Sequence, residues 1–200
     1  MSQTQTGGVI LVVCLLFAVI TAGQEISNDP AEVHCPAVLG VGVNTDLAFC
    51  DILIQYDAGL GARVVLPSHQ GEATVSFNLH NRHTYSEDEV EAGRAFSSYT
   101  AEIAVASLEG DVLGRRFIQS EFRSRDDLVD RIAGGAGPNG LKAISPTGTE
   151  RVFVTIPGGL NEVFIVGQGL QVVRADAREN VVDAGRTVAV ISDVRIEYQP

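Results

Sequence analysis

The chain is 200 residues long, which fits one domain preceded by a targeting segment. Its formal net charge is −11, and every charged side chain follows residue 23. Nucleic-acid backbones and anionic lipid headgroups are also negative, so this charge argues against a nucleic-acid partner and against binding to a membrane surface.

The amino terminus resembles a secretory signal peptide. Residues 9–22 form an apolar run that is followed by small residues and then by a polar, acidic chain. A membrane-spanning helix needs about 20 apolar residues, so the run has the length of a signal-peptide core. We therefore expect residues 1–23 to be removed, leaving a secreted or periplasmic protein without stable membrane insertion. The alternative is a membrane anchor through an uncleaved segment, because no Lys or Arg precedes residue 9.

Residues 24–34 are polar and predict a flexible lead into the domain. The two cysteines that follow, Cys35 and Cys50, are expected to form a disulfide, because paired cysteines of exported proteins usually bridge. Closing this loop would stabilise the fold by about 3 kcal/mol in the chain-entropy account. The competing interpretation is metal ligation by Cys35 together with its neighbour His34. Adjacent side chains on an extended chain point apart, which favours the disulfide.

Residues 35–200 are expected to form a single mainly β domain, because the dominant hydrophobic period is two. In residues 74–80, for example, Val75, Phe77 and Leu79 share one face, and His80 lies on the opposite, polar face. Many short segments of this kind, punctuated by Gly, Pro, Asn or Asp, predict an antiparallel β-sandwich of the jelly-roll or immunoglobulin-like type. The predicted strands are residues 51–57, 62–67, 74–81, 99–106, 112–122, 150–157, 161–167, 170–177, 186–192 and 193–199.

Helical signals occur in two places. Ser124 precedes residues 125–135, which carry Asp126 and Asp127 in the first turn and a glycine at the end. This pattern predicts one short helix that docks Leu128 and its apolar neighbours over an open end of the sandwich. Residues 86–89 have capping-box order and predict a single turn.

The stretch FNLHNRHTYSEDE, residues 77–89, is the candidate metal site, with potential ligands His80, His83, Glu87, Asp88 and Glu89. Zinc needs three or four ligands at fixed distances, yet residues i and i+3 of a strand point to opposite faces. Both imidazoles reach one metal only if the chain turns between them. No cofactor is expected from this pattern, although the carboxylates could recruit calcium. The plainer interpretation is a solvated strand end and an acidic loop.

A glycine-rich segment, residues 134–140, is the second candidate binding loop, with Gly134, Gly135, Pro138 and Asn139 as its distinctive residues. Loops of sandwich proteins often carry binding sites. The chain lacks the Gly-x-Ser-x-Gly, His-Glu-x-x-His and phosphate-loop patterns, so an enzyme is not indicated.

Three classes of function stay open. The first is a non-enzymatic binding or structural module of the cell envelope or extracellular space, with an unknown protein or carbohydrate partner. The second is a carbohydrate-active hydrolase whose carboxylates come from distant strands. The third is a small metal-binding protein that uses His80 and His83.

Overall fold

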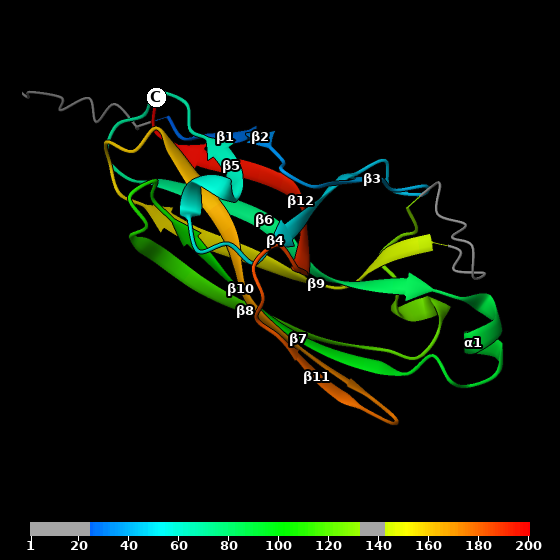
Figure 1. Ribbon diagram of the computed structural model, residues 1–200. Coiled ribbons are helices and arrows are strands. Elements are labelled where there is room, and N and C mark those ends of the chain that lie inside the picture. The colour runs from blue at the N-terminus through cyan, green and yellow to red at the C-terminus, as the bar shows by residue number, and fades with distance from the viewer. Residues whose placement is uncertain (1–24, 133–142) are drawn as a thin grey trace, which may run out of the picture.

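The computed structural model describes residues 25–132 and 143–200, and it shows two antiparallel six-stranded sheets that face each other (Figure 1). In the first sheet the order is β3-β4-β12-β6-β9, with β1 also paired to β12. In the second sheet the order is β2-β5-β10-β7-β8, with β11 also paired to β10. The prediction of a mainly β, antiparallel protein is confirmed, and a sandwich is consistent with it.

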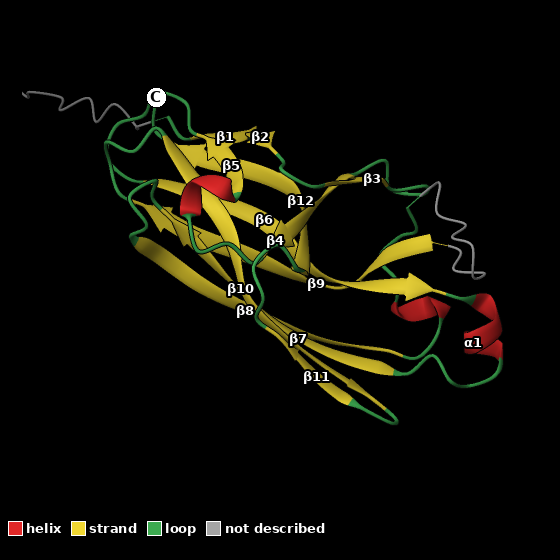
Figure 2. Ribbon diagram, in the orientation of Figure 1, coloured by secondary structure: helices red, strands yellow, loops and turns green. Residues whose placement is uncertain are grey.

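The strands of the first sheet are β1 (Ser27–Pro30), β3 (Val38–Val41), β4 (Ala48–Leu53), β6 (Ala73–Tyr85), β9 (Ala143–Ile156) and β12 (Thr187–Tyr198). Those of the second are β2 (Glu32–His34), β5 (Ala62–Val65), β7 (Ser97–Ala106), β8 (Val112–Phe122), β10 (Glu162–Arg174) and β11 (Arg178–Val181). The helical elements among the described residues are the short helix α1 (Glu87–Glu91) and the single turns η1 (Ala58–Leu60) and η2 (Arg125–Asp127) (Figure 2).

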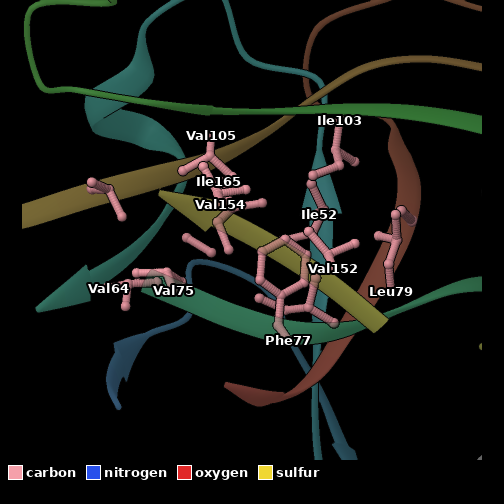
Figure 3. Close-up of a cluster of buried hydrophobic side chains, with 14 of the residues drawn as sticks. Ile52, Val64, Val75, Phe77, Leu79, Ile103, Val105, Val152, Val154 and Ile165 are labelled. Carbon is pink, nitrogen blue, oxygen red and sulfur yellow. The ribbon is translucent and has the colours of Figure 1, made fainter. Parts of the chain in front are cut away.

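The core lies between the sheets and follows from the alternation seen in the sequence. Val75, Phe77 and Leu79 of β6 are fully buried, as are Ile103 and Ile165 from the opposite sheet. In Figure 3 the labelled side chains of both sheets point toward one another. A continuous apolar layer of this kind supplies the main driving force for folding.

The disulfide between Cys35 and Cys50 is present, so this prediction is confirmed. Its Cα atoms are 5.8 Å apart, within the range that a disulfide spans without backbone distortion. Cys35 follows β2 of the second sheet and Cys50 lies in β4 of the first. The bridge therefore joins the two layers of the sandwich.

The expected flexible lead is different in the structure, because residues 27–34 form β1 and β2. β1 pairs with β12 and β2 pairs with β5. Side chains hold β1 as well: Arg195 donates to Asn28, and the Tyr198 hydroxyl donates to Asp29. Arg195 and Tyr198 lie more than 160 positions away from β1 in the chain. The polar composition of residues 24–34 therefore gave no indication that these residues form strands.

The predicted helix at residues 125–135 is wrong over the part that the structure describes. Ser124 caps the segment as the sequence indicated, and it forms a capping box with Asp127, but only the turn η2 follows. From Leu128 the chain is extended, and the amides of Val129 and Ile132 donate to carbonyl groups of β9. Pairing with β9 therefore replaces the helix. By contrast, the turn predicted at residues 86–89 is confirmed as α1, which is capped by Ser86.

Asp130 ties this extended segment to the turn at residues 42–47. Its carboxylate accepts from the amide of Thr45 at 2.8 Å, from the Thr45 hydroxyl at 2.6 Å and from the amide and side chain of Asn44. Burial raises the pKa of this carboxyl group, but the hydrogen bonds from Thr45, Arg131 and Asn44 outweigh burial and leave the pKa below its usual value. A Cβ atom on Gly42 would collide with Asp130 Oδ2, so the turn needs glycine there.

Replacing Asp130 with asparagine is expected to lower the free energy of unfolding by about 2 kcal/mol, because a buried, charged acceptor of several hydrogen bonds is lost. Urea unfolding measures the change. Asp126→Asn is the matched control, because Asp126 is exposed in the same segment. Equal losses in the two variants would show that the contacts to Asn44 and Thr45 contribute nothing specific.

Among the described residues, no helix is long and apolar enough to cross a membrane.

Candidate functional site

A pocket of about 300 Å³ lies where β11 extends the second half of β10 and where β12 begins. Residues of the five strands β6, β7, β10, β11 and β12 contribute to its walls. We call it the arginine pocket. Its lining residues are Arg82, His83, Thr84, Ser97, Tyr99, Leu170, Val172, Arg174, Glu179, Val181, Arg186, Thr187 and Val188.

A second pocket of about 550 Å³ adjoins the first, since both are lined by His83, Thr84, Ser97 and Arg174. It extends toward α1 and the segment at residues 93–96. The two pockets therefore share a wall built from β6, β7 and the end of β10. A ligand larger than the arginine pocket would extend into this neighbouring space.

His83 is held in this shared wall by contacts on two sides. Its Nδ1 lies 2.6 Å from the Tyr99 hydroxyl, and its ring stacks on Phe122 with the centroids 3.7 Å apart. The residue is 9% exposed. Within residues 25–132 and 143–200 its other ring nitrogen, Nε2, has no hydrogen-bond partner. His83 is thus a fixed, nearly buried part of the wall that the two pockets share.

The protonation state of His83 follows from its surroundings. Burial, together with the positive charge of Arg174, lowers the pKa of His83 to about 4. The imidazole is therefore neutral at neutral pH. Burial raises the pKa of Tyr99, whose hydroxyl also has a side-chain hydrogen bond with Ser97. If Ser97 donates to the Tyr99 oxygen, Tyr99 donates to Nδ1 and the proton of the imidazole sits on Nε2.

The arginines of the pocket are held in two different ways. Arg82 makes a tight ion pair with Asp51, at 2.7 Å. Burial raises the pKa of Asp51 to about 6, although the charge of Arg82 opposes this shift. Arg174 and Arg186 share one carboxylate, Glu179, at the longer distances of 3.5 and 3.6 Å.

His80, the other histidine of the candidate metal site, was expected on a solvated face but is fully buried. Its Nδ1 lies 2.8 Å from the Gly148 carbonyl oxygen and its Nε2 lies 2.9 Å from Ser192 Oγ. Phe49 packs edge-on against its ring as part of a small cluster that covers this region of the first sheet. The alternation of side chains along β6 predicted correctly that His80 faces away from Phe77 and Leu79. It could not show that side chains of β3, β4 and neighbouring segments cover that face.

The Ser192–His80 pair resembles the nucleophile and base of a hydrolase in its spacing. Here Ser192 is 2% exposed and His80 is 0% exposed, so a substrate has no access to the histidine. The pair holds β12 to β6, and through Gly148 it also holds β9. Its role in this fold is structural.

The candidate metal ligands do not converge. The strand β6 continues to Tyr85, so it does not end before His83 as expected, and His80 and His83 point to opposite faces of the sheet. Glu87 pairs with Arg125 and Glu89 pairs with Arg94. Asp88 stands in the exposed first turn of α1 and has a partner of its own. Nowhere in the described residues do three His, Cys, Asp or Glu side chains form a group that could hold a metal ion.

The candidate binding loop with Gly134, Gly135, Pro138 and Asn139 lies outside the described residues. The arginine pocket itself escaped the sequence analysis. Arg174 ends β10 beside the hairpin turn and Arg186 follows β11, so strand pairing is what brings them into one pocket with His83 and Tyr99.

No protein-family model matches this chain, and no curated protein matches it in sequence. Weak similarity exists to solved structures of the T13 IBDV viral particle (13% identity, TM-score 0.21), of the infectious bursal disease virus Gt strain (15%, 0.19) and of the infectious bursal disease virus VP2 subviral particle (14%, 0.18). The matches cover 87%, 87% and 95% of this chain but only 41%, 43% and 46% of those chains. This chain therefore spans less than half their length, and TM-scores of this size carry no argument about function.

Proposed function

We propose that the protein is an exported, non-enzymatic binding module of the cell envelope or extracellular space, and that it binds a small ligand in the arginine pocket. The observation that carries this proposal is the pair of adjoining pockets, whose shared wall holds His83 fixed by Tyr99 and Phe122. The wall of the pocket is therefore preformed, and a preformed hollow lined by a few polar groups is a natural place for a ligand.

The chemistry of the pocket supports binding rather than catalysis. Its only carboxylate, Glu179, is paired with Arg174 and Arg186, so it is poorly placed to take a proton from a substrate. The pKa of His83, about 4, also makes this imidazole a weak base. The disulfide fits an oxidising compartment, which is the environment that the amino-terminal segment predicts.

Filling the pocket tests the binding proposal. Thr84 is exposed and lines both pockets, so Thr84→Trp is expected to abolish ligand binding with little loss of stability. Thr155→Trp is the matched control, because Thr155 is an exposed threonine of β9 that lines neither pocket. Ligand-observed NMR with a panel of small carboxylates, amines, amides and sugars provides the measurement. The proposal is wrong if no compound binds the native protein, or if every compound binds the two variants equally.

Export is tested separately. We expect the protein purified from its native host to begin near residue 23 or 24, because small residues follow the apolar run at residues 9–22. Mass spectrometry of the intact protein measures this. Recovery of the complete amino terminus in the membrane fraction would instead support the uncleaved anchor.

A further inference from the structure

Two arginines of the pocket have their hydrogen-bonding capacity largely unused. Arg174 and Arg186 approach Glu179 at 3.5 and 3.6 Å, whereas charge-assisted hydrogen bonds are normally about 2.7–2.9 Å long. Neither guanidinium donates a hydrogen bond to any of the described residues. Arg82, by contrast, is committed to Asp51 at 2.7 Å. Arg174 and Arg186 are therefore the two cations available to a ligand.

The charges of these groups add up to a site for one negative charge. Asp51 offsets Arg82, and Glu179 offsets one of the pair Arg174 and Arg186, so one positive charge remains in the pocket. The pocket thus carries an excess of positive charge, although the chain as a whole has a net charge of −11. An anion is thus attracted by the pocket and repelled by most of the remaining surface.

The remaining walls define the shape of the ligand. Leu170 is the half-buried apolar part of the wall, whereas Val172, Val181 and Val188 behind it are only 2–4% exposed. A planar guanidinium matches a carboxylate through two parallel N–H···O bonds, and the neutral imidazole of His83 adds a polar wall without adding a charge. A monoanionic head and a short apolar body fit this combination better than a doubly charged, fully polar ion.

We infer that the arginine pocket binds a small monocarboxylate, with Arg174 and Arg186 at the carboxylate and Leu170 against the apolar body. This inference rests on the proposed function, since it specifies the ligand class of the same pocket. The volume of about 300 Å³ accommodates a short-chain acid.

The experiment compares hexanoate with hexanamide, its neutral analogue of the same shape, and with inorganic phosphate. Titrations of the full, unreduced protein are followed by NMR at the signals of His83, Val172 and Val181. We expect saturable shifts with hexanoate and none with hexanamide or phosphate. Arg174→Gln and Arg186→Gln are each expected to weaken hexanoate binding about tenfold, because each removes a charge-assisted contact.

Arg178→Gln is the matched control, because Arg178 belongs to the same hairpin, is exposed and does not line the pocket. It is expected to bind hexanoate like the native protein. Thermal unfolding of the three variants checks that each is folded. Unchanged hexanoate affinity in folded Arg174→Gln and Arg186→Gln variants would refute the assignment of these arginines.

The remaining outcomes separate the inference from the proposed function. Equal binding of hexanamide and hexanoate overturns the carboxylate inference and leaves a ligand pocket. Binding of phosphate without hexanoate overturns it in favour of another anion. Absence of binding by every compound of the panel, including the neutral ones, overturns both.

Discussion

A variant in which Cys35 and Cys50 are both replaced by alanine is expected to lose about 3 kcal/mol of unfolding free energy. The bridge closes a loop with a sequence separation of 15, and opening it releases conformational freedom in the unfolded chain. The variant also loses a covalent link within the folded protein, because the disulfide joins β4 of the first sheet to the segment that follows β2 of the second.

Urea unfolding of the unreduced native protein and of the double variant measures this loss. The native protein in excess reductant is the internal control, since it should unfold with nearly the same midpoint as the variant. If the oxidised native protein and the double variant have equal midpoints, the bridge does not stabilise the fold.

The second large effect concerns acid. His83 has a folded-state pKa of about 4, below its ordinary value of 6.5, so the unfolded chain takes up the proton first as the pH falls. The stability that neutral, buried His83 contributes is fully present above pH 6.5 and is lost as the pH falls toward 4. At about 1.4 kcal/mol per pH unit, the loss amounts to about 3 kcal/mol.

Asp51 and His80 also affect how stability changes with pH below neutral. We therefore predict the difference in unfolding free energy between the native protein and a variant without His83. The pKa of Asp51 is raised to about 6, so its contribution changes with the opposite sign and stability rises as the pH falls from about 6 to 3.8. Burial lowers the pKa of His80, which adds to the loss. Both contributions cancel when the native protein is compared with His83→Gln.

The unfolding free energy of the native protein minus that of His83→Gln is therefore expected to fall by about 3 kcal/mol between pH 7 and pH 4. Urea titrations at a series of pH values provide the measurement. His34→Gln serves as the control, because His34 is exposed in β2. A difference that stays constant with pH would mean that His83 titrates alike in the folded and unfolded chain.

Local sequence patterns predicted the features that depend on interactions between residues close in the chain. The alternation around Val75, Phe77 and Leu79 located a buried strand, because side chains of a strand alternate regardless of what lies beyond it. The hydroxyl of Ser86 predicted the start of α1, since a cap acts within one turn. The two cysteines predicted their own bridge, because they are the only two after the apolar run.

Glycine and aspartate residues within two long strands were interpreted as strand ends, for a physical reason. Residues 161–167 and 170–177 were predicted as separate strands, as were residues 186–192 and 193–199. In the structure each pair is one strand, β10 or β12, with an irregularity at Gly167 or near Asp193. Glycine and aspartate permit unusual backbone angles in a bulge as well as in a turn, so composition alone does not separate the two.

The mainly β class, the disulfide and the strands of the core could be predicted from the chain alone, because period, capping and cysteine pairing act between residues close in the chain. The three-dimensional structure was needed to show that His80 is covered, that residues from 128 pair with β9 instead of forming a helix, and that Arg174 and Arg186 line one pocket with His83. Each of these outcomes depends on contacts between segments far apart in the chain, and the free energy of such contacts outweighs the local preferences that sequence patterns report.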